Sequence, residues 1–309
     1  MLPSGHEFGY IDWLRRRLPA DRRVPVGIGD DAALVQFTGG RCLVTTDMLM
    51  EGVDFTFDSA TPQQIGYKSL AVNLSDLAAM AAIPVAAVVA VALPRQHGFE
   101  LGQGIQDGLQ ALAAEFDIAL AGGDTNTWDG PLVLSITAFG EPTGTGPVLR
   151  SGARPGDWVL ATGTFGGSIA GRHLDFTPRV REALVLHARC SLHAMIDVSD
   201  GLSADLGHIL EESNVGAILD EQAIPISDAA AGLSDNRTPL EHALTDGEDF
   251  ELLLTVAPDE AATLLACPPF ATRLTRIGEI VSGSGLKLRT AAGDLRDIPA
   301  RGWVHRFGE

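Results

Sequence analysis

An uncharged stretch of eighteen residues, Leu77–Pro94, constrains the fold of this chain more than any other feature. Its length approaches the ~20 residues that a membrane-spanning helix needs. Eight of its positions are alanine, however, and Pro84 lies in the middle, where a proline would break a continuous helix. The β-branched run Val85–Leu93 that follows is typical of a buried strand. We therefore predict a buried helix that ends before Pro84, then a strand, and no membrane partner.

Strand-like and helix-like segments alternate on both sides of this stretch. Thr61-Pro62-Gln63-Gln64 supplies an N-cap, a first-turn proline and a capping-box glutamine, which predicts a helix from there to about Ala82. Neighbouring strands occur as well as strand–helix crossings, so the predicted class is α/β with mixed, α+β-type sheets. Further helices are expected at 8–18, 99–116, 167–174, 179–189, 202–212 and 259–265, and strands at 41–46, 85–93, 118–121, 132–140, 158–161, 194–198, 217–219, 250–256 and 274–280.

The length and one Gly- and Pro-rich segment predict two domains. At ~150 residues per domain, a chain of 309 residues is expected to form about two. The segment Glu141–Asp157, EPTGTGPVLRSGARPGD, is the best candidate for a linker. We therefore place the first domain at residues 1–145 and the second at residues 146–309.

The composition excludes several classes of partner. Forty Asp and Glu against 22 Lys and Arg give a formal net charge of −18, which argues against a nucleic-acid or anionic-membrane surface. Cys42, Cys190 and Cys267 are far apart and form no CxxC pair, so neither a disulfide framework nor a zinc site is indicated. Residues 1–20 lack the apolar run of a secretory signal. The expected compartment is a reducing cytoplasm.

The common nucleotide and nucleophile motifs are absent. The sequence contains no GxxxxGK[ST] and no HExxH, and Gly166–Ala170 fails the GxSxG pattern, so hydrolase functions lose most of their support. Gly163–Ser168 follows a predicted strand and precedes a predicted helix, where free N–H groups can hold an anion. A plain tight turn is the more common meaning of such a segment.

Aspartates at the ends of apolar segments are the chemical feature that the sequence does offer. Any one of them is explained as a helix cap or a turn residue. Together, with serine and threonine hydroxyls beside them and no cysteine or histidine partners, they form an oxygen-only set that suits Mg²⁺ rather than zinc. The set comprises Asp30, Asp31, Asp47, Asp76, Asp124, Asp197 and Asp200.

Asp76 is the aspartate least easily explained by a turn. It lies inside a predicted helix among apolar neighbours, where a buried carboxylate has to be paired, protonated or bound to a cation. Lys68 lies eight residues earlier, about two turns away on the same helix face. A structural ion pair with Lys68 is therefore the alternative to a metal ligand.

Seven motifs occur in the order found in thiamine-monophosphate kinases, which belong to the superfamily of aminoimidazole ribonucleotide synthetase. They are GIGDDAA, TTDMLMEGVDF, YKSLAVNLSDLAAM, AGGDT, LRSGARPGD, IDVSDGLSADL and DGEDFEL. The chain resembles this family from about Glu7 to Trp303. The resemblance implies a two-domain fold of the synthetase type, with an N-terminal domain that binds ATP and several Mg²⁺ ions and a C-terminal domain that closes over it, usually in a homodimer. It also implies ATP-dependent phosphorylation of thiamine monophosphate to thiamine diphosphate.

The resemblance also implies three sets of site residues. An aromatic ring at Trp303 suits a cationic thiazolium. At Asp54 the sequence departs from the family, which usually has histidine there. The implied Mg²⁺ ligands are Asp30, Thr45, Thr46, Asp47, Asp76, Asp124, Asp197 and Asp200, the ATP contacts are Gly123, Asp124, Arg150 and Ser199, and the thiamine phosphate contacts are Asp54, Glu248 and Trp303.

The implied reaction is consistent with the residues. The acceptor is a phosphate oxygen whose second pKa is near ~6, so it is largely anionic at neutral pH and needs no strong general base. Carboxylate-held Mg²⁺ would reduce the repulsion between the two polyanionic substrates. Two alternatives stay open: another ATP-dependent enzyme of the same superfamily, and a catalytically silent scaffold that binds a nucleotide or a metal.

Overall fold

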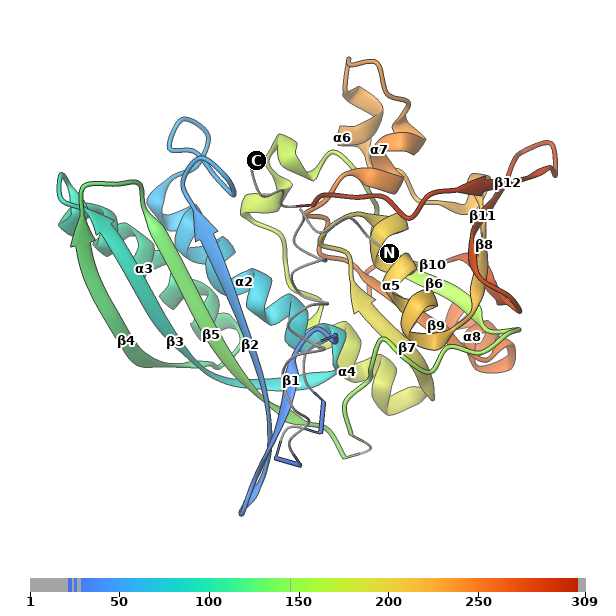
Figure 1. Cartoon of the computed structure of the whole chain (residues 1–309), viewed down its shortest axis with the longest axis horizontal. Helices are drawn as coiled ribbons and strands as arrows, with labels where there is room; N and C mark the ends of the chain where they lie inside the picture. Colours follow the sequence, from blue (N-terminus) through green and yellow to red (C-terminus); the bar gives the residue numbers. More distant parts are fainter. Residues whose placement is uncertain (1–21, 24, 27–28, 145, 305–309) are drawn as a thin grey trace.

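The computed structural model describes residues 22–23, 25–26, 29–144 and 146–304 (Figure 1). The helix predicted at 8–18 lies outside the described residues. The described chain forms two sheets in sequence order, one from β1 to β5 and one from β6 to β12. No helix among the described residues is long and apolar enough to cross a membrane.

The first sheet has five strands in the order β1-β2-β5-β3-β4. The β3–β4 pair is parallel and the other pairs are antiparallel, which confirms the predicted mixed sheet. Helices α2 and α3 lie along one face of this sheet, the inner face (Figure 1). The elements are β1 Ala33–Phe37, β2 Gly40–Met50, α2 Pro62–Ala79, β3 Ala82–Pro94, α3 Gly98–Glu115, β4 Ala119–Trp128 and β5 Val133–Pro142.

Helix α2 is the buried centre of the molecule. It begins with the predicted capping box at Thr61 and Gln64, and thirteen of its eighteen residues are buried. It packs on the first sheet through β2, β3 and β5, and on the opposite side against α4 and β7 of the second half. Gly66 allows its close contact with α3, because a Cβ there would lie 2.0 Å from the Ile105 carbonyl oxygen. As predicted, the helix ends before Pro84, which lies at an irregular pairing of β3 with β5.

The second sheet has seven strands in the order β12-β11-β8-β10-β6-β9-β7. The predicted strands and the helices α4, α5 and α8 are present, whereas the β11–β12 hairpin and the short helices α6 and α7 were not predicted. The elements are β6 Trp158–Thr162, α4 Val180–Arg189, β7 Leu192–Asp197, α5 Leu202–Ser213, β8 Gly216–Asp220, α6 Asp228–Gly232, α7 Pro239–Thr245, β9 Leu252–Val256, α8 Pro258–Ala266, β10 Leu274–Val281, β11 Gly285–Arg289 and β12 Leu295–Ile298.

Two sequence-based predictions are wrong in ways that matter for the site. Strands β2 and β4 are longer than expected, so Asp47 and Asp124 lie inside strands rather than after them. The helix predicted at 167–174 is replaced by two 3₁₀ turns, at 168–170 and 172–174. Gly167 and Gly171 have φ values of 71° and 137°, a conformation that interrupts an α-helix.

One large apolar cluster runs through both halves of the chain. It joins Leu43 and Leu134 of the first sheet to Leu160 and Met195 of the second, with Leu74 of α2 between them. A second cluster lies within the second half, around α5. Helix α2 therefore packs against elements of both halves and lies between the two sheets. The boundary near residue 145 falls between the sheets and stays a prediction.

Candidate active site

Four aspartates from separate elements meet beside the buried helix α2. We call Asp31, Asp47, Asp76 and Asp197 the carboxylate cluster. One carboxylate oxygen from each of Asp31, Asp76 and Asp197 lies within 4.8 Å of the other two. Asp47, on β2, lies against Asp76. The cluster therefore joins the start of β1, β2, α2 and the end of β7 at one point.

The hydrogen-bond donors around the cluster are too few for its oxygens. Thr45 Oγ1 donates to Asp76 Oδ2 over 2.5 Å, and Ser75 Oγ donates to Asp197 Oδ2 over 2.6 Å. Asp47 Oδ2 is buried and has no hydrogen-bond partner among the described residues. A buried, unpartnered carboxylate oxygen is costly unless a cation meets it. The donor set is all oxygen, so the residues fit Mg²⁺.

The pKa values of the acidic side chains express the same shortage of positive charge. Burial raises the pKa of Asp47 to about 6 and that of Asp197 to about 8, and the charge of Asp31 adds to the shift of Asp197. Burial, then the charges of Asp47 and Asp197, raises the pKa of Asp76 well above its ordinary value. Burial and Asp31 raise the pKa of Asp30 to about 7. A divalent cation would displace the protons that these carboxylates hold.

Arg150 is the cation that faces this cluster. Its Nε and Nη2 atoms donate to the two carboxylate oxygens of Asp31 over 3.0 and 2.8 Å. Its backbone nitrogen lies 3.3 Å from each carboxylate oxygen of Asp30. Asp31 belongs to the acidic set seen in the sequence but not to the Mg²⁺ ligands that the resemblance implies, although the structure places it inside the cluster. The adjacent acidic pair in GDD was the available signal.

Asp200 and Trp303 lie together at the start of α5. The backbone nitrogen of Trp303 donates to the Asp200 carbonyl over 2.9 Å, and the Trp303 side chain is 57% exposed. Carboxylate or ring atoms of Asp200, Asp205 and His208 lie within 4.8 Å of one another. Asp205 Oδ2 also accepts from the Asp200 and Gly201 backbone nitrogens over 3.0 Å, which holds the turn before α5. Ser199, another predicted contact, precedes this turn.

Two of the predicted ligands lie on the outer face of the first sheet. Thr46 pairs with Thr137, whose β3 partner is Val88, and Asp124 pairs with Ala90. Directly paired residues share a face, so Thr46 and Asp124 lie on the face opposite the buried side chain of Asp47. Three strand spacings, about 14 Å, separate β2 from β4. The structure does not bring these two residues to the carboxylate cluster.

Gly123, a predicted ATP contact, lies on β4 and faces α3. It lines a pocket of about 680 Å³ between that strand and the helix. A volume of this size suits a small molecule.

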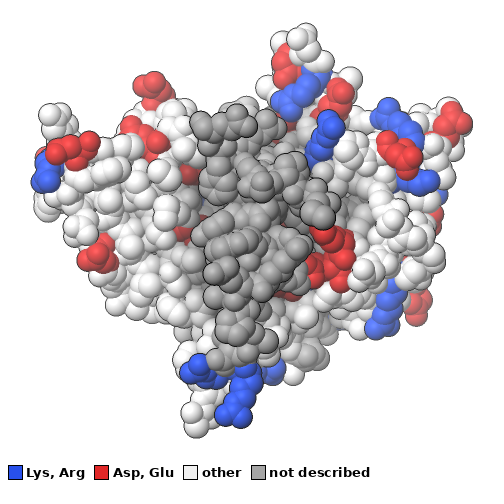
Figure 2. Space-filling view, viewed as in Figure 1, with Lys and Arg blue, Asp and Glu red and all other residues white. Residues whose placement is uncertain are grey.

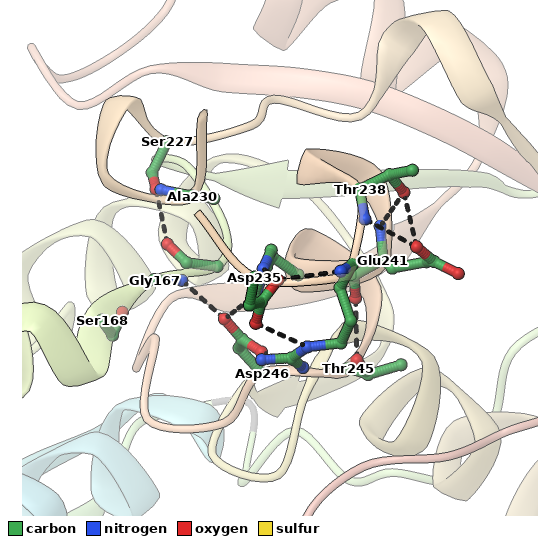
Figure 3. A network of polar contacts seen from close by, with 12 residues as sticks. Gly167, Ser168, Ser227, Ala230, Asp235, Thr238, Glu241, Thr245 and Asp246 are labelled. Carbon is green, nitrogen blue, oxygen red and sulfur yellow. Dashed lines mark hydrogen bonds and ion pairs between the residues drawn. The ribbon is translucent and has the colours of Figure 1, made fainter. Parts of the chain in front are cut away.

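The Gly-rich loop at 163–168 is occupied by carboxylates of the chain itself. Gly166 N donates to both carboxylate oxygens of Asp249 over 3.0 and 2.9 Å. Gly167 N donates to Asp246 Oδ2 over 2.9 Å, and Figure 3 shows Asp246 directed at this nitrogen from the end of α7. These N–H groups are therefore not free to hold a ligand anion.

The predicted substrate contacts Asp54 and Glu248 meet on a single lysine. Lys68 Nζ donates to the Asp54 carbonyl over 2.8 Å and to Glu248 Oε1 over 2.5 Å. The expected alternative, an ion pair between Lys68 and Asp76, is therefore wrong. The Asp54 carboxylate turns back into its own loop, where Oδ2 accepts from Met50 N over 2.7 Å.

Surface charge follows the acidic composition. On the face shown in Figure 2, the Lys and Arg side chains are scattered and form no continuous patch.

Comparisons with known proteins identify the family to which this chain is similar. The family model for AIR synthase related protein, N-terminal domain, matches residues 29–141, and that for the C-terminal domain matches residues 167–291. The thiamine-monophosphate kinase of Rhodopirellula baltica is 42% identical over 97% of each chain. The solved structure of AaThiL complexed with AMPPCP and TMP has a TM-score of 0.83 and 28% identity, with 97% of each chain covered. Thiamine-monophosphate kinase from Stenotrophomonas maltophilia has a TM-score of 0.73 and 38% identity, covering 91% of this chain and 96% of its own.

Proposed function

The chain belongs to the thiamine-monophosphate kinase family of AIR synthase-related proteins, and we propose from this that it transfers the γ-phosphoryl group of ATP to thiamine monophosphate. The products are thiamine diphosphate and ADP. The observation in the structure that carries the proposal is the carboxylate cluster, with its unpartnered Asp47 Oδ2. Such a cluster supplies the metal-based charge neutralisation that a kinase without a P-loop requires.

The proposed metal site uses the residues around Asp76. Asp47, Asp76 and Asp197 would hold Mg²⁺; Thr45 adjoins them through its hydrogen bond to Asp76, and Asp30 lies next to Asp31 and the Arg150 backbone. Mg²⁺ held by these residues would supply the positive charge that offsets the repulsion between the phosphate groups of the two substrates. The remaining proposed ligands, Thr46, Asp124 and Asp200, lie apart from this cluster. They would therefore have to hold ions other than the one at the cluster.

The proposed substrate contacts divide between the two halves. Arg150, Ser199, Gly123 and Asp124 would contact ATP. Asp54, Glu248 and Trp303 would contact thiamine monophosphate. Because the acceptor phosphate is already anionic, the chain has only to position it, and no residue has to act as a general base.

We also propose a homodimer that works in the cytoplasm. Helices α2 and α3 cover the inner face of the first sheet, whereas its outer face presents Met48, 59% exposed, together with the partly exposed Val88, Val133 and Phe139. A second copy packed on this face would bury these apolar side chains. All three cysteines are free thiols, which fits a reducing compartment. Light scattering on the wild type and on Met48→Arg tests the dimer, since the variant is expected to be monomeric.

A product assay tests the function. The purified chain is incubated with ATP, Mg²⁺ and, separately, thiamine monophosphate, thiamine or a formylglycinamidine ribonucleotide, and the products are identified by mass. We expect thiamine diphosphate from thiamine monophosphate alone, and none when EDTA replaces Mg²⁺. Turnover of the ribonucleotide would favour another enzyme of the superfamily, and no turnover at all would favour a silent scaffold.

A further inference from the structure

Lys68 is a buried cation in a chain that has only one other lysine, Lys287. It lies on α2, and its side chain is 1% exposed. An ammonium group has three N–H donors, and two oxygen acceptors and one imidazole nitrogen surround this one. They are the Asp54 carbonyl at 2.8 Å, His173 Nδ1 at 3.0 Å and Glu248 Oε1 at 2.5 Å.

The three partners come from separate parts of the chain. Asp54 lies in the loop after β2, within the first half, where Lys68 binds its backbone rather than its carboxylate. His173 lies in the second 3₁₀ turn and Glu248 in the segment before β9, both in the second half. Lys68 therefore links the two halves at the point where two of the three proposed thiamine contacts, Asp54 and Glu248, meet.

Glu248 is held from both sides. Oε1 binds Lys68, and Oε2 lies 3.0 Å from His173 Nδ1, while the side chain remains 26% exposed. Burial raises the pKa of Glu248, but the hydrogen bond from His173 and the charge of Lys68 outweigh burial and leave this pKa below its ordinary value. The carboxylate therefore stays ionised at neutral pH, as contact with a cationic thiazolium requires.

The backbone of this segment is strained, so its side chains have to hold it. Glu248 has a φ of 63° and Phe250 a φ of 49°, in the left-handed region that residues other than glycine rarely adopt. Asp246 and Asp249 bind Gly167 and Gly166 within the second half. Glu248 turns the other way, toward α2, and Lys68 and His173 are its anchors there.

We propose that Lys68 and His173 are positioning residues that fix the Glu248 carboxylate and the Asp54 loop in the arrangement that binds the thiamine part of the substrate. This inference rests on the proposed function. Neither residue touches the carboxylate cluster in any contact described above, so their loss should weaken binding of thiamine monophosphate while leaving ATP binding and phosphoryl transfer nearly intact.

Steady-state kinetics of Lys68→Met tests the proposal, because methionine keeps the apolar stem and removes the charge and the donors. We expect KM for thiamine monophosphate to rise by about tenfold or more, while KM for ATP and kcat stay within about threefold. Lys68→Arg should also show a raised KM, since a planar guanidinium cannot replace an ammonium whose partners lie around a single point. Arg289→Met is the control, because it removes a cation that pairs with Asp220 and Glu279 at the far edge of the second sheet.

A double-mutant cycle with Glu248→Gln separates positioning from general stabilisation. If Lys68 acts through Glu248, adding Lys68→Met to Glu248→Gln should raise KM for thiamine monophosphate by less than about twofold. Should Lys68→Met fail to fold, His173→Leu removes the contacts of Nδ1 to Glu248 Oε2 and to Lys68 Nζ but keeps the bond between Lys68 and Glu248, and we expect about a threefold rise in the same KM.

Two results would overturn the inference while the proposed function stands. In the first, the wild type forms thiamine diphosphate and Lys68→Met has the same KM for thiamine monophosphate as the wild type. If Lys68→Met does not fold, the same result in His173→Leu counts. The other is an equal rise in both KM values, or additive effects in the cycle, which would make Lys68 a structural residue only. A wild type that forms no thiamine diphosphate would overturn the proposed function and this inference together.

Discussion

Two acid-rich regions of this chain have opposite surroundings. In the 246–251 segment every anchoring carboxylate meets its own donors: Asp246 binds Gly167 N, His242 and Arg237; Asp249 binds Gly166 N, Ser168 and Arg172; and Glu251 binds Thr162 and Arg179. In the carboxylate cluster, Asp31 is paired with Arg150, whereas Asp47, Asp76 and Asp197 lie mainly beside one another.

The difference shows how to separate a structural carboxylate from a metal ligand. A buried carboxylate that is fully paired holds the fold together, and removing its charge leaves an unpaired cation behind. A buried carboxylate whose neighbours are other carboxylates destabilises the metal-free fold and is useful only when a cation arrives. Acidic composition alone does not distinguish the two regions.

Asp76→Asn should give the largest effect. It removes a charge with little change in shape, so we expect kcat to fall by at least about 100-fold and the apparent Mg²⁺ affinity to weaken. The metal-free protein should be as stable as the wild type or more so, because a like-charge contact is relieved. Activity assays across Mg²⁺ concentrations and thermal unfolding in EDTA measure both. Normal metal dependence with a lower Tm would instead assign Asp76 to the structural class.

Glu251→Gln should show the opposite pattern. The Glu251 side chain is 2% exposed and binds Arg179 through two hydrogen bonds of 2.7 Å, so its loss strands a cation. We expect about 3 kcal/mol of lost stability, a Tm roughly 5–10 °C lower, and little change in Mg²⁺ dependence. Denaturant unfolding measures the loss. A stable variant that has lost its activity would contradict the distinction.

The sequence was sufficient for most elements of the fold because their local signals agree with their burial. The capping box at Thr61 and the uncharged run before Pro84 identify α2, and α2 is the wall on which both sheets pack. The helix expected at 167–174 is absent because Gly167 has a positive φ, and its N–H binds Asp246, 79 residues away in sequence, instead of a carbonyl of its own helix. No local pattern encodes such a contact.

The candidate site was predicted less completely. Asp47, Asp76 and Asp197 stand out in the sequence because each is an aspartate at the end of an apolar segment or inside one. The structure brings these three together. Asp31 resembles an ordinary turn aspartate, and Lys68 resembles a partner for Asp76 at helical spacing. Their actual partners, Arg150 and Glu248, lie 119 and 180 residues away in sequence. Pairings over such separations are set by tertiary structure, so a single sequence does not specify them.

The pH dependence of metal stabilisation sharpens the comparison. The folded-state pKa values of Asp47, Asp30 and Asp197, about 6, 7 and 8, lie above the unfolded value near ~4. A raised folded-state pKa means that this contribution to stability is complete below pH ~4 and is lost as the pH rises through ~6–8. We therefore expect the metal-free Tm to fall over this range.

Thermal unfolding with and without Mg²⁺ checks this expectation. Because Mg²⁺ replaces the lost protons, the rise in Tm on adding Mg²⁺ should be larger at pH ~8 than at pH ~6. Each kcal/mol of added unfolding free energy should raise Tm by about 2–4 °C. Asp76→Asn is the control and should show a smaller gain at both values. A gain that shrinks as the pH rises would mean that these carboxylates are not the metal site.

Asp54→His should give the smallest effect, because the Asp54 carboxylate turns back into its own loop. The variant loses the hydrogen bond to Met50 N, at a cost of about 1 kcal/mol. It also removes a negative charge from a proposed substrate contact, and a histidine there could donate to the substrate phosphate. We expect KM for thiamine monophosphate to fall several-fold and kcat to stay within a few fold, as for a uniform binding contact. Asp58→His, an equal charge change at an exposed position of the same loop, is the matched control and should leave KM unchanged. A collapse of kcat in Asp54→His alone would show that Asp54 is a metal-binding or catalytic residue. Asp54 would then belong with the carboxylate cluster rather than with the substrate contacts.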